Sequence, residues 1–483
     1  FYMNYRIIFR LLGQILLVEA VFLLPSAGLC FFDGQGNSAA AFLLSALACA
    51  VCGSVFFLIG RKANRTFFAR EGFVCVGLSW IVMSLFGALP FFLSGEIPSY
   101  LDALFEIVSG FTTTGSSILP NAEMLSRGAL LWRSFSHWLG GMGVLVFLLA
   151  IAPGEKGGFS LHLLRAESPG PNVGKLVPKM KRTALILYLL YIVLTVCNLI
   201  FLLCGDMPWF DALCTAFGTA GTGGFGIRAD SMASYSPYLQ TVTTVFMFLF
   251  GVNFTLYYSV LRQFRSIAKN EEIRLYLGLA VLSTAVIAWN IAPQLGSVRS
   301  AIHHAAFQVS SVMTTTGFST ADFNVWPNLS KTILLLLMIV GACAGSTGGG
   351  LKCARMVLLW KSFKRNIRKI LHPQSVKLVR ADGVVVNEEV MKATNLYLVT
   401  YTGILLFSWL VISFDGFDIE TNLSAVFSCF NNIGPGLGVV GPMGNFAAFG
   451  VVSKLVLIFD MLAGRLELFP ILVLLAPSTW RRR

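Results

Sequence analysis

Four glycine turns recur along this chain, and each has the residue types from which bare backbone could bind a cation. They are centred on Gly115, Gly224, Gly317 and Gly434, with mostly small hydroxylic or amide residues in front of the glycine. Glycine permits backbone angles that turn carbonyl oxygens to one side, and a ring of carbonyl oxygens can replace the water around an ion. We predict that four turns close one ring: Thr113, Thr114, Gly115; Thr222, Gly223, Gly224; Thr315, Thr316, Gly317; and Asn432, Ile433, Gly434.

The composition is that of a membrane protein. Hydrophobic residues make up 56% of the 483 residues and charged residues only 12%, whereas charged residues are about a quarter of a soluble domain. Most of the 36 Lys and Arg residues fall in the N-terminus, in alternate loops between apolar runs and in the C-terminus. This bias predicts that both termini are cytoplasmic, and it explains the net charge of +13 without nucleic-acid binding. The ten Cys residues are scattered, mostly inside apolar runs, so we expect no disulfide framework.

The apolar runs predict an all-α membrane protein with four copies of one unit. Each copy has a spanning helix, a short amphipathic segment, a glycine turn and a second spanning helix. A segment of about 12 residues rises only ~18 Å as a helix and cannot cross a bilayer core of ~30 Å. It must therefore re-enter, and its non-helical turn must line an internal cavity. We expect spans at 6–32, 39–60, 73–93, 129–152, 184–204, 238–262, 273–291, 331–360, 391–413 and 447–476.

The copies define five parts of the chain. Residues 1–70 hold two leading transmembrane helices, and the pore repeats follow at 71–165, 166–268, 269–372 and 373–483. We predict four pseudo-symmetric helix–pore-loop–helix repeats around one ion pore. The fourth repeat begins with a small cytoplasmic β-hairpin around 381–383. The basic linkers at 153–183 and 361–390 suit lipid headgroups and topology, or alternatively a docking face for a cytosolic partner.

A strip of small residues interrupts the second span of the third copy. It comprises Cys343, Ala344, Gly345, Ser346, Thr347, Gly348, Gly349 and Gly350. So many small residues unwind a helix, which predicts a flexible gate below the ring; the alternative is a close helix crossing. A phosphate-binding loop would need Gly-Lys-Ser/Thr, which the strip lacks.

Arg465 is a guanidinium deep in an apolar span, where charge is costly and usually functional. We interpret it as a positive charge in the pore that belongs to the gate; the alternative is a structural pair with a carboxylate from another element. Arg133 and His137, one turn apart, are interpreted as outer-end anchors and packing residues.

Together these residues resemble the TrkH/KtrB superfamily of potassium transporters, over essentially the whole chain. The motifs are the four glycine turns, the strip, Asn431–Gly438 and Gly464–Glu467, and the two leading spans make its TrkH branch the closer one. The resemblance implies potassium uptake across a bacterial inner membrane by a homodimer with one pore per subunit. It also implies a cytosolic TrkA-like ring that carries the regulatory nucleotide, potassium as the only bound ion, and a path obstructed by the strip and Arg465. The second turn departs from the pattern at Gly223 and Gly226, a difference that bears on the flexibility and the selectivity of this quarter of the ring.

The resulting hypothesis is a gated, moderately selective potassium pathway driven by the membrane potential. Each turn has a single equivalent glycine, so few carbonyl rings form and discrimination against sodium is expected to be modest. No catalytic dyad lies beside a cavity, so we expect no enzyme. The alternative is a sodium- or proton-coupled symporter of the same fold, with Glu19, Asp460 and Glu467 as candidate coupling groups.

Overall fold

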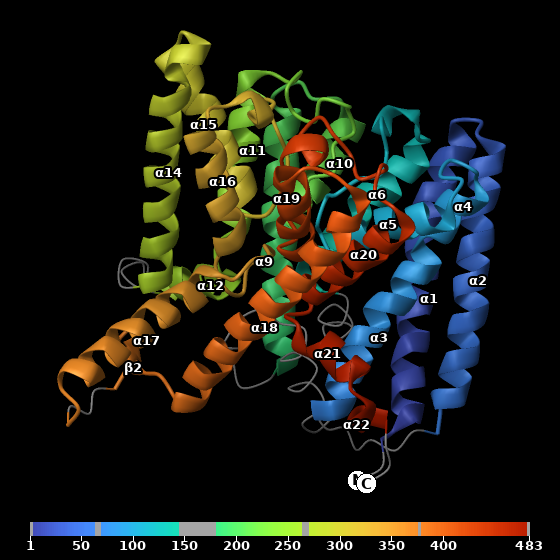
Figure 1. Ribbon diagram of the computed structural model, residues 1–483. Helices are drawn as coiled ribbons and strands as arrows, with labels where there is room; N and C mark the ends of the chain where they lie inside the picture. The colour runs from blue at the N-terminus through green and yellow to red at the C-terminus, as the bar shows by residue number, and fades with distance from the viewer. Residues whose placement is uncertain (1–2, 63–68, 144–179, 263–269, 375–377, 481–483) are drawn as a thin grey trace.

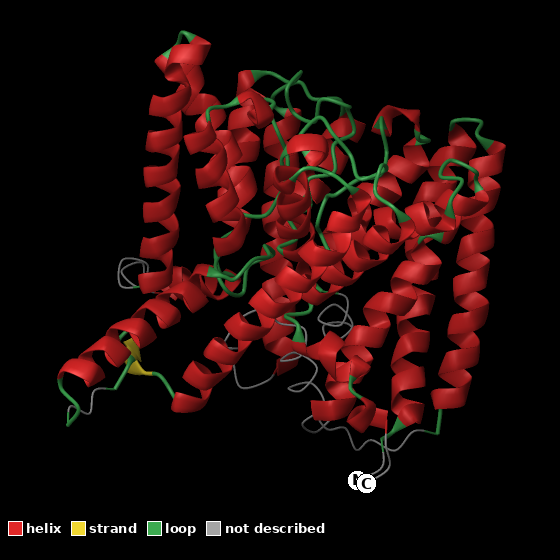
Figure 2. Ribbon diagram, in the orientation of Figure 1, coloured by secondary structure: helices red, strands yellow, loops and turns green. Residues whose placement is uncertain are grey.

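The computed structural model describes residues 3–62, 69–143, 180–262, 270–374 and 378–480. In these residues nearly all regular structure is helical (Figure 2). Six of the described helices are long and apolar enough to cross a membrane. They run through Tyr5–Phe32, Gly36–Gly60, Arg70–Leu93, Arg182–Leu203, Glu271–Leu295 and Glu388–Asp415.

Two antiparallel helices lead the chain and form one edge of the molecule (Figure 1). They are α1 (Tyr5–Phe32) and α2 (Gly36–Gly60). Gly13 and Gly53 let their backbones meet closely, because a Cβ on Gly13 would lie 2.6 Å from the Gly53 carbonyl oxygen. Small residues in this pattern allow close helix packing in a membrane.

Four successions of helices follow. Each begins with a long helix, contains a shorter helix that ends at a glycine turn, and has one or more helices after that turn. The first has α3 (Ala69–Gly87), α4 (Leu89–Leu93), α5 (Tyr100–Phe111) and α6 (Arg127–Met142). The second has α9 (Met180–Leu203), α10 (Trp209–Gly221), α11 (Pro237–Phe250) and α12 (Phe254–Arg262). The third has α14 (Glu271–Leu295), α15 (Val298–Met313), α16 (Asn328–Val340) and α17 (Cys353–Leu371). The fourth has α18 (Glu388–Ile412), α19 (Ile419–Phe430), α20 (Val451–Arg465), α21 (Phe469–Leu475) and α22 (Pro477–Trp480).

The short helices α5, α10, α15 and α19 lie in the half of the molecule opposite α22 and the start of α1 (Figure 1). Three of them begin at a side-chain N-cap, because Ser99, Ser297 and Asp418 accept a bond from the backbone N–H three residues on. Each of the four buries several small residues, and in α10 most of the buried residues are Ala, Thr or Gly. Small side chains allow these helices to pack closely behind the turns that follow them.

The small hairpin predicted before the fourth succession is present. Strands β1 (Arg380–Ala381) and β2 (Val384–Val385) pair antiparallel through Arg380 with Val385 and Ala381 with Val384. The other basic linker was predicted at 153–183. Its residues 153–179 lie outside the described part of the chain.

Two predicted spans are wrong as continuous helices. The span at 238–262 is broken between α11 and α12, at Gly251–Asn253, and the span at 447–476 is broken between α20 and α21. Backbone from elsewhere fills the first break: the Cys343 N–H donates to the Gly251 carbonyl and the Phe254 N–H to the Gly345 carbonyl, each at 3.0 Å. In the second break, Glu467 and Leu468 both have positive φ, 58° and 66°. In the span at 129–152, helix α6 ends at Met142, and 144–152 lie outside the described residues.

Candidate ion-binding site

The four short helices end in the same way. In each, the residue before the turn glycine donates its N–H to a carbonyl five residues back, and the preceding residue donates to a carbonyl three residues back, which is a Schellman cap. The first bonds are Thr114 to Ser109 at 2.8 Å, Gly223 to Gly218 at 2.9 Å, Thr316 to Ser311 at 2.8 Å and Ile433 to Ser428 at 2.9 Å. The C-terminal end of each helix, where its dipole is negative, therefore adjoins a turn and favours a cation there.

Each cap places a non-glycine residue in the left-handed region, followed two residues later by a glycine of positive φ. The non-glycine residues are Thr113, Thr222, Thr315 and Asn432, with φ of 55°, 54°, 57° and 56°. The glycines are Gly115, Gly224, Gly317 and Gly434, with φ of 83°, 71°, 90° and 105°. A β-branched threonine rarely adopts this conformation, and such strain clusters at functional sites. The non-glycine φ angles agree within 3°, and with the shared cap bonds they show that the four helix ends have closely similar backbone shapes.

The four turns also lie edge to edge in a closed cycle. A Cβ on Gly115 would lie 2.0 Å from the Gly223 carbonyl oxygen, and one on Gly224 would lie 1.9 Å from that of Thr316. A Cβ on Gly317 would lie 2.2 Å from the Ile433 oxygen, and one on Gly434 would lie 2.9 Å from that of Thr114. Each glycine thus faces the carbonyl that precedes the next turn's glycine. The structure brings together all twelve residues that the sequence analysis assigned to the ring.

A cavity of about 110 Å³ lies against this ring. All four turn glycines line it, together with Ser116, Phe225 and Ser319 from the residues that follow them. Hydroxyl pairs brace the first and third turns: Thr112 and Thr114 are 2.8 Å apart through their Oγ1 atoms, and Thr314 and Thr316 are 2.7 Å apart. Each bond links the residue that caps the end of the helix to the residue before the turn glycine.

The strip between α16 and α17 lies directly beside the third and fourth turns. Residues 341–352 form no helix, and a Cβ on Gly348 would lie 2.7 Å from the Thr314 carbonyl oxygen. One on Gly349 would lie 2.3 Å from the Asn431 oxygen, and the Gly349 N–H donates to Thr315 Oγ1 at 2.7 Å. Backbone of the strip therefore lies against the third and fourth turns, and its glycines allow that approach.

Arg465, at the end of α20, joins the strip to α6. Its guanidinium donates to the carbonyl oxygens of Thr347 at 2.6 Å and Gly141 at 2.7 Å, and also to that of Gly140. The nearby carboxylate Glu467 instead forms an ion pair with Arg355 of α17. Arg465 thus contacts carbonyl groups from both the first and the third succession.

Comparison with known proteins decides the family. A family model described as TrkH, cation transport protein, matches residues 38–482. This chain belongs to the TrkH family. It is 36% identical over 492 residues to the Trk system potassium uptake protein TrkH of Salmonella typhimurium, covering 99% of this chain and all of that one. It is also 36% identical to the protein of the same name from Escherichia coli K12. The crystal structure of the potassium transporter TrkH from Vibrio parahaemolyticus matches with a TM-score of 0.88 at 31% identity, covering 99% of this chain and all of that one.

One contact in this TrkH-family chain has no signal in the sequence. Glu272, at the start of α14, is buried, and its Oε1 accepts from the backbone N–H groups of Ala344 at 2.5 Å and Ala354 at 3.1 Å. One carboxylate thus ties the strip to the first turn of α17. A glutamate in the first turn of a helix is an ordinary feature, so only the fold reveals this role.

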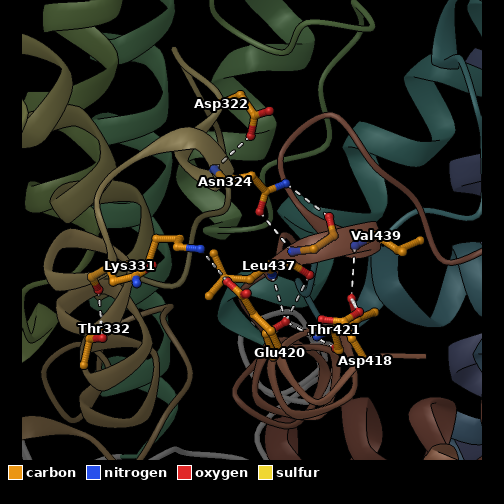
Figure 3. Close-up of polar contacts among 12 residues, drawn as sticks. Asp322, Asn324, Lys331, Thr332, Asp418, Glu420, Thr421, Leu437 and Val439 are labelled. Atoms are coloured by element: carbon orange, nitrogen blue, oxygen red, sulfur yellow. Dashed lines mark hydrogen bonds and ion pairs between the residues drawn. The ribbon is translucent and has the colours of Figure 1, made fainter. Parts of the chain in front are cut away.

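Polar contacts join the loop after α15 to the loop after α19 (Figure 3). The Asn324 amide donates to the Gly438 carbonyl at 3.1 Å and accepts from the Gly438 N–H at 3.0 Å. Lys331 and Glu420 add an ion pair of 2.9 Å nearby. These contacts link the segments that follow the third and fourth turns of this TrkH-family chain.

Proposed function

We propose that this chain takes up potassium across the bacterial inner membrane through a gated, moderately selective pore. Relatives that match it over their full length are named potassium uptake proteins. The observation that carries the proposal is the closed cycle of four turns, in which each glycine faces the next turn's carbonyl. A ring of carbonyl dipoles at the C-terminal ends of four helices suits a desolvated monovalent cation.

In this proposal the four successions are pseudo-symmetric repeats around one pore. The ring residues bind potassium through backbone carbonyls, and the cavity beside the glycines is the outer entrance. Each turn offers one glycine of positive φ at the ring, so the filter is short. A short filter has fewer binding sites, which is why we expect measurable sodium permeation.

The strip and Arg465 form the gate of the proposed pore. Support comes from the contact of Gly348 and Gly349 with the ring and from the bonds that Arg465 makes to Thr347 and α6. Closure places backbone and a positive charge on the path of a cation. Opening requires the strip to leave the third and fourth turns.

The protein is proposed to act as a homodimer with a cytosolic TrkA-like ring, which carries the nucleotide and controls the gate. Its relatives are named components of a Trk system, which supports partner subunits. Both termini are proposed to be cytoplasmic, on the side where α17 bears Lys361, Lys364, Arg365, Arg368 and Lys369.

Coupled symport is the second candidate. Glu19 and Asp460 are buried, and both Glu19 carboxylate oxygens and Asp460 Oδ2 have no hydrogen-bond partner among the described residues. Buried carboxyl groups of this kind inside a membrane protein can carry protons. Glu467 is a weaker candidate because Arg355 neutralises it. A reversal potential that follows potassium alone would exclude this candidate.

Growth of a bacterial strain that lacks its own potassium uptake systems tests the proposal. Expression of the chain with its cognate cytosolic partner should restore growth at low potassium, and uptake should rank potassium and rubidium above sodium. Failure to restore growth, with the protein present in the membrane, would contradict potassium uptake.

Replacing Glu272 by alanine should raise ungated potassium flux about tenfold. The two N–H groups on the strip and α17 would lose their acceptor, and a buried unpaired donor costs about 1–3 kcal/mol, which shifts the closed state toward opening. Flux into liposomes without the cytosolic partner is the measurement. Glu271→Ala is the matched control, since that neighbour is partly exposed and pairs with Lys361. Equal flux in both variants would remove Glu272 from the gate.

A further inference from the structure

The second turn lacks the hydroxyl pair that braces the first and third turns. Gly221 and Gly223 stand where those turns have Thr112 with Thr114 and Thr314 with Thr316. A Cβ on Gly221 would lie 2.2 Å from the carbonyl oxygen of His137, and one on Gly223 would lie 2.2 Å from Cγ and Nδ1 of the same histidine. One residue of α6 therefore occupies the space of both missing side chains.

His137 also bonds to backbone of the first and second pore segments. It is fully buried, its Nδ1 is 2.8 Å from the Gly110 carbonyl oxygen, and its Nε2 is 3.3 Å from the Phe225 backbone nitrogen. A carbonyl can only accept and an N–H can only donate, so Nδ1 carries the proton and Nε2 accepts. The neutral imidazole links the end of α5 to the residue that follows Gly224.

Arg133 lies one helical turn before His137 and holds the outer side of the same turn. Its Nη1 donates to the Gly226 carbonyl at 3.1 Å, and its guanidinium lies 3.8 Å from the centre of the Phe225 ring. Its Nε donates to Glu106 at 2.5 Å, and both partners are buried. Glu106 Oε2 in turn accepts from the Ile118 N–H at 2.9 Å, beyond the first turn.

We infer that His137 and Arg133 are specificity-determining positioning residues, which supply from the first repeat the rigidity that the second turn lacks in its own side chains. The inference rests on the proposed ion filter. It explains why two glycines are tolerated there: the turn is braced by a neighbour rather than by hydroxyl groups. Both side chains act on the ring through backbone, His137 at Phe225 and Arg133 at Gly226.

The test compares His137→Leu with His137→Gln in liposomes, with the potassium-to-sodium permeability ratio and the maximal potassium flux measured separately. Leucine removes both bonds, and the ratio should fall about three- to tenfold, as expected for a loss of one or two hydrogen bonds that fix the turn. Glutamine retains an amide oxygen near the Nε2 position and should recover most of the ratio. His303→Gln is the matched control, because the His303 ring contacts the Gln240 side chain, 2.7 Å away, rather than a turn.

Gly317→Ala, measured in parallel, separates a failure of the proposed brace from a failure of the proposed filter. If that variant loses selectivity while His137→Leu keeps the parent ratio, the filter stands and the brace is wrong. If neither variant changes the ratio, the proposed filter itself fails.

A double-mutant cycle gives a readout that does not depend on transport. Gly223→Ala should lower the melting temperature in detergent, because its methyl group meets the His137 ring. In a His137→Ala background the same substitution should cost much less, since the ring is gone. Additive effects of the two substitutions would overturn the claim that His137 fills the space beside Gly223.

Discussion

Replacing Gly317 by alanine should abolish most of the discrimination between potassium and sodium. Gly317 has φ of 90°, and the new methyl group would lie 2.2 Å from the Ile433 carbonyl oxygen and 3.1 Å from Pro435. A left-handed conformation costs an L-residue about 1–2 kcal/mol, and the contact forces the carbonyl itself to move. Because 1.4 kcal/mol corresponds to a factor of ten, we expect the permeability ratio to fall about tenfold or more.

Gly278→Ala provides the matched control for this prediction. That glycine lies inside α14 of the same repeat, and a Cβ there would meet nothing within 4 Å. It should leave selectivity unchanged, and alanine should favour the helix slightly. A parental permeability ratio in Gly317→Ala, from protein that is folded and inserted, would contradict the assignment of the third turn to the filter.

Replacing Arg465 by alanine should produce a strong increase in potassium flux in the absence of the cytosolic partner. The variant loses a positive charge and the bonds to the carbonyls of Thr347, Gly140 and Gly141 that hold the strip against α6. Hydrogen bonds from a charged group contribute about 1.5–3 kcal/mol, so an increase on the order of ten- to a hundredfold is expected. Removal of several residues from 343–350 should also increase the potassium flux in the absence of the cytosolic partner.

Arg465→Lys distinguishes the charge from the bonds. Lysine keeps the positive charge, but it lacks the planar guanidinium group that bonds to both sets of carbonyls. The potassium flux of Arg465→Lys should therefore lie between that of the parent and that of Arg465→Ala. Single-channel conductance and open probability are the two readouts. Unaltered conductance and open probability in Arg465→Ala would show that the guanidinium only packs the helices together.

The turns themselves could be predicted from the sequence because their signal is local. A glycine one or two residues after threonine or asparagine, beyond a segment too short to cross a membrane, predicts a re-entrant turn. The cycle of contacts could not be predicted in the same way. Gly115 meets Gly223 and Gly434 meets Thr114 across long stretches of chain, and no local pattern encodes which turns are neighbours.

The helix breaks show a second limit of the sequence. Gly251 alone did not predict the break between α11 and α12, because a single glycine is tolerated inside an apolar helix. The break is stable because Cys343 and Gly345 of the strip form hydrogen bonds with the backbone groups that it leaves unpaired. Glu467 and Leu468 take left-handed angles without any glycine, and Pro470, in the first turn of α21, was the available indication. The contacts of His137 and Arg133 with the second turn could not be predicted, because the sequence does not place α6 beside that turn.

The reversal potential of the purified protein in a planar bilayer tests the central claim most directly. With potassium on one side and sodium on the other, a ring of backbone carbonyls should set a reversal potential displaced toward the potassium equilibrium value and independent of pH. Gly317→Ala should move it toward zero, while Gly278→Ala should leave it in place. A parent reversal potential at zero, or one that follows the sodium or proton gradient, would contradict a potassium-selective ring.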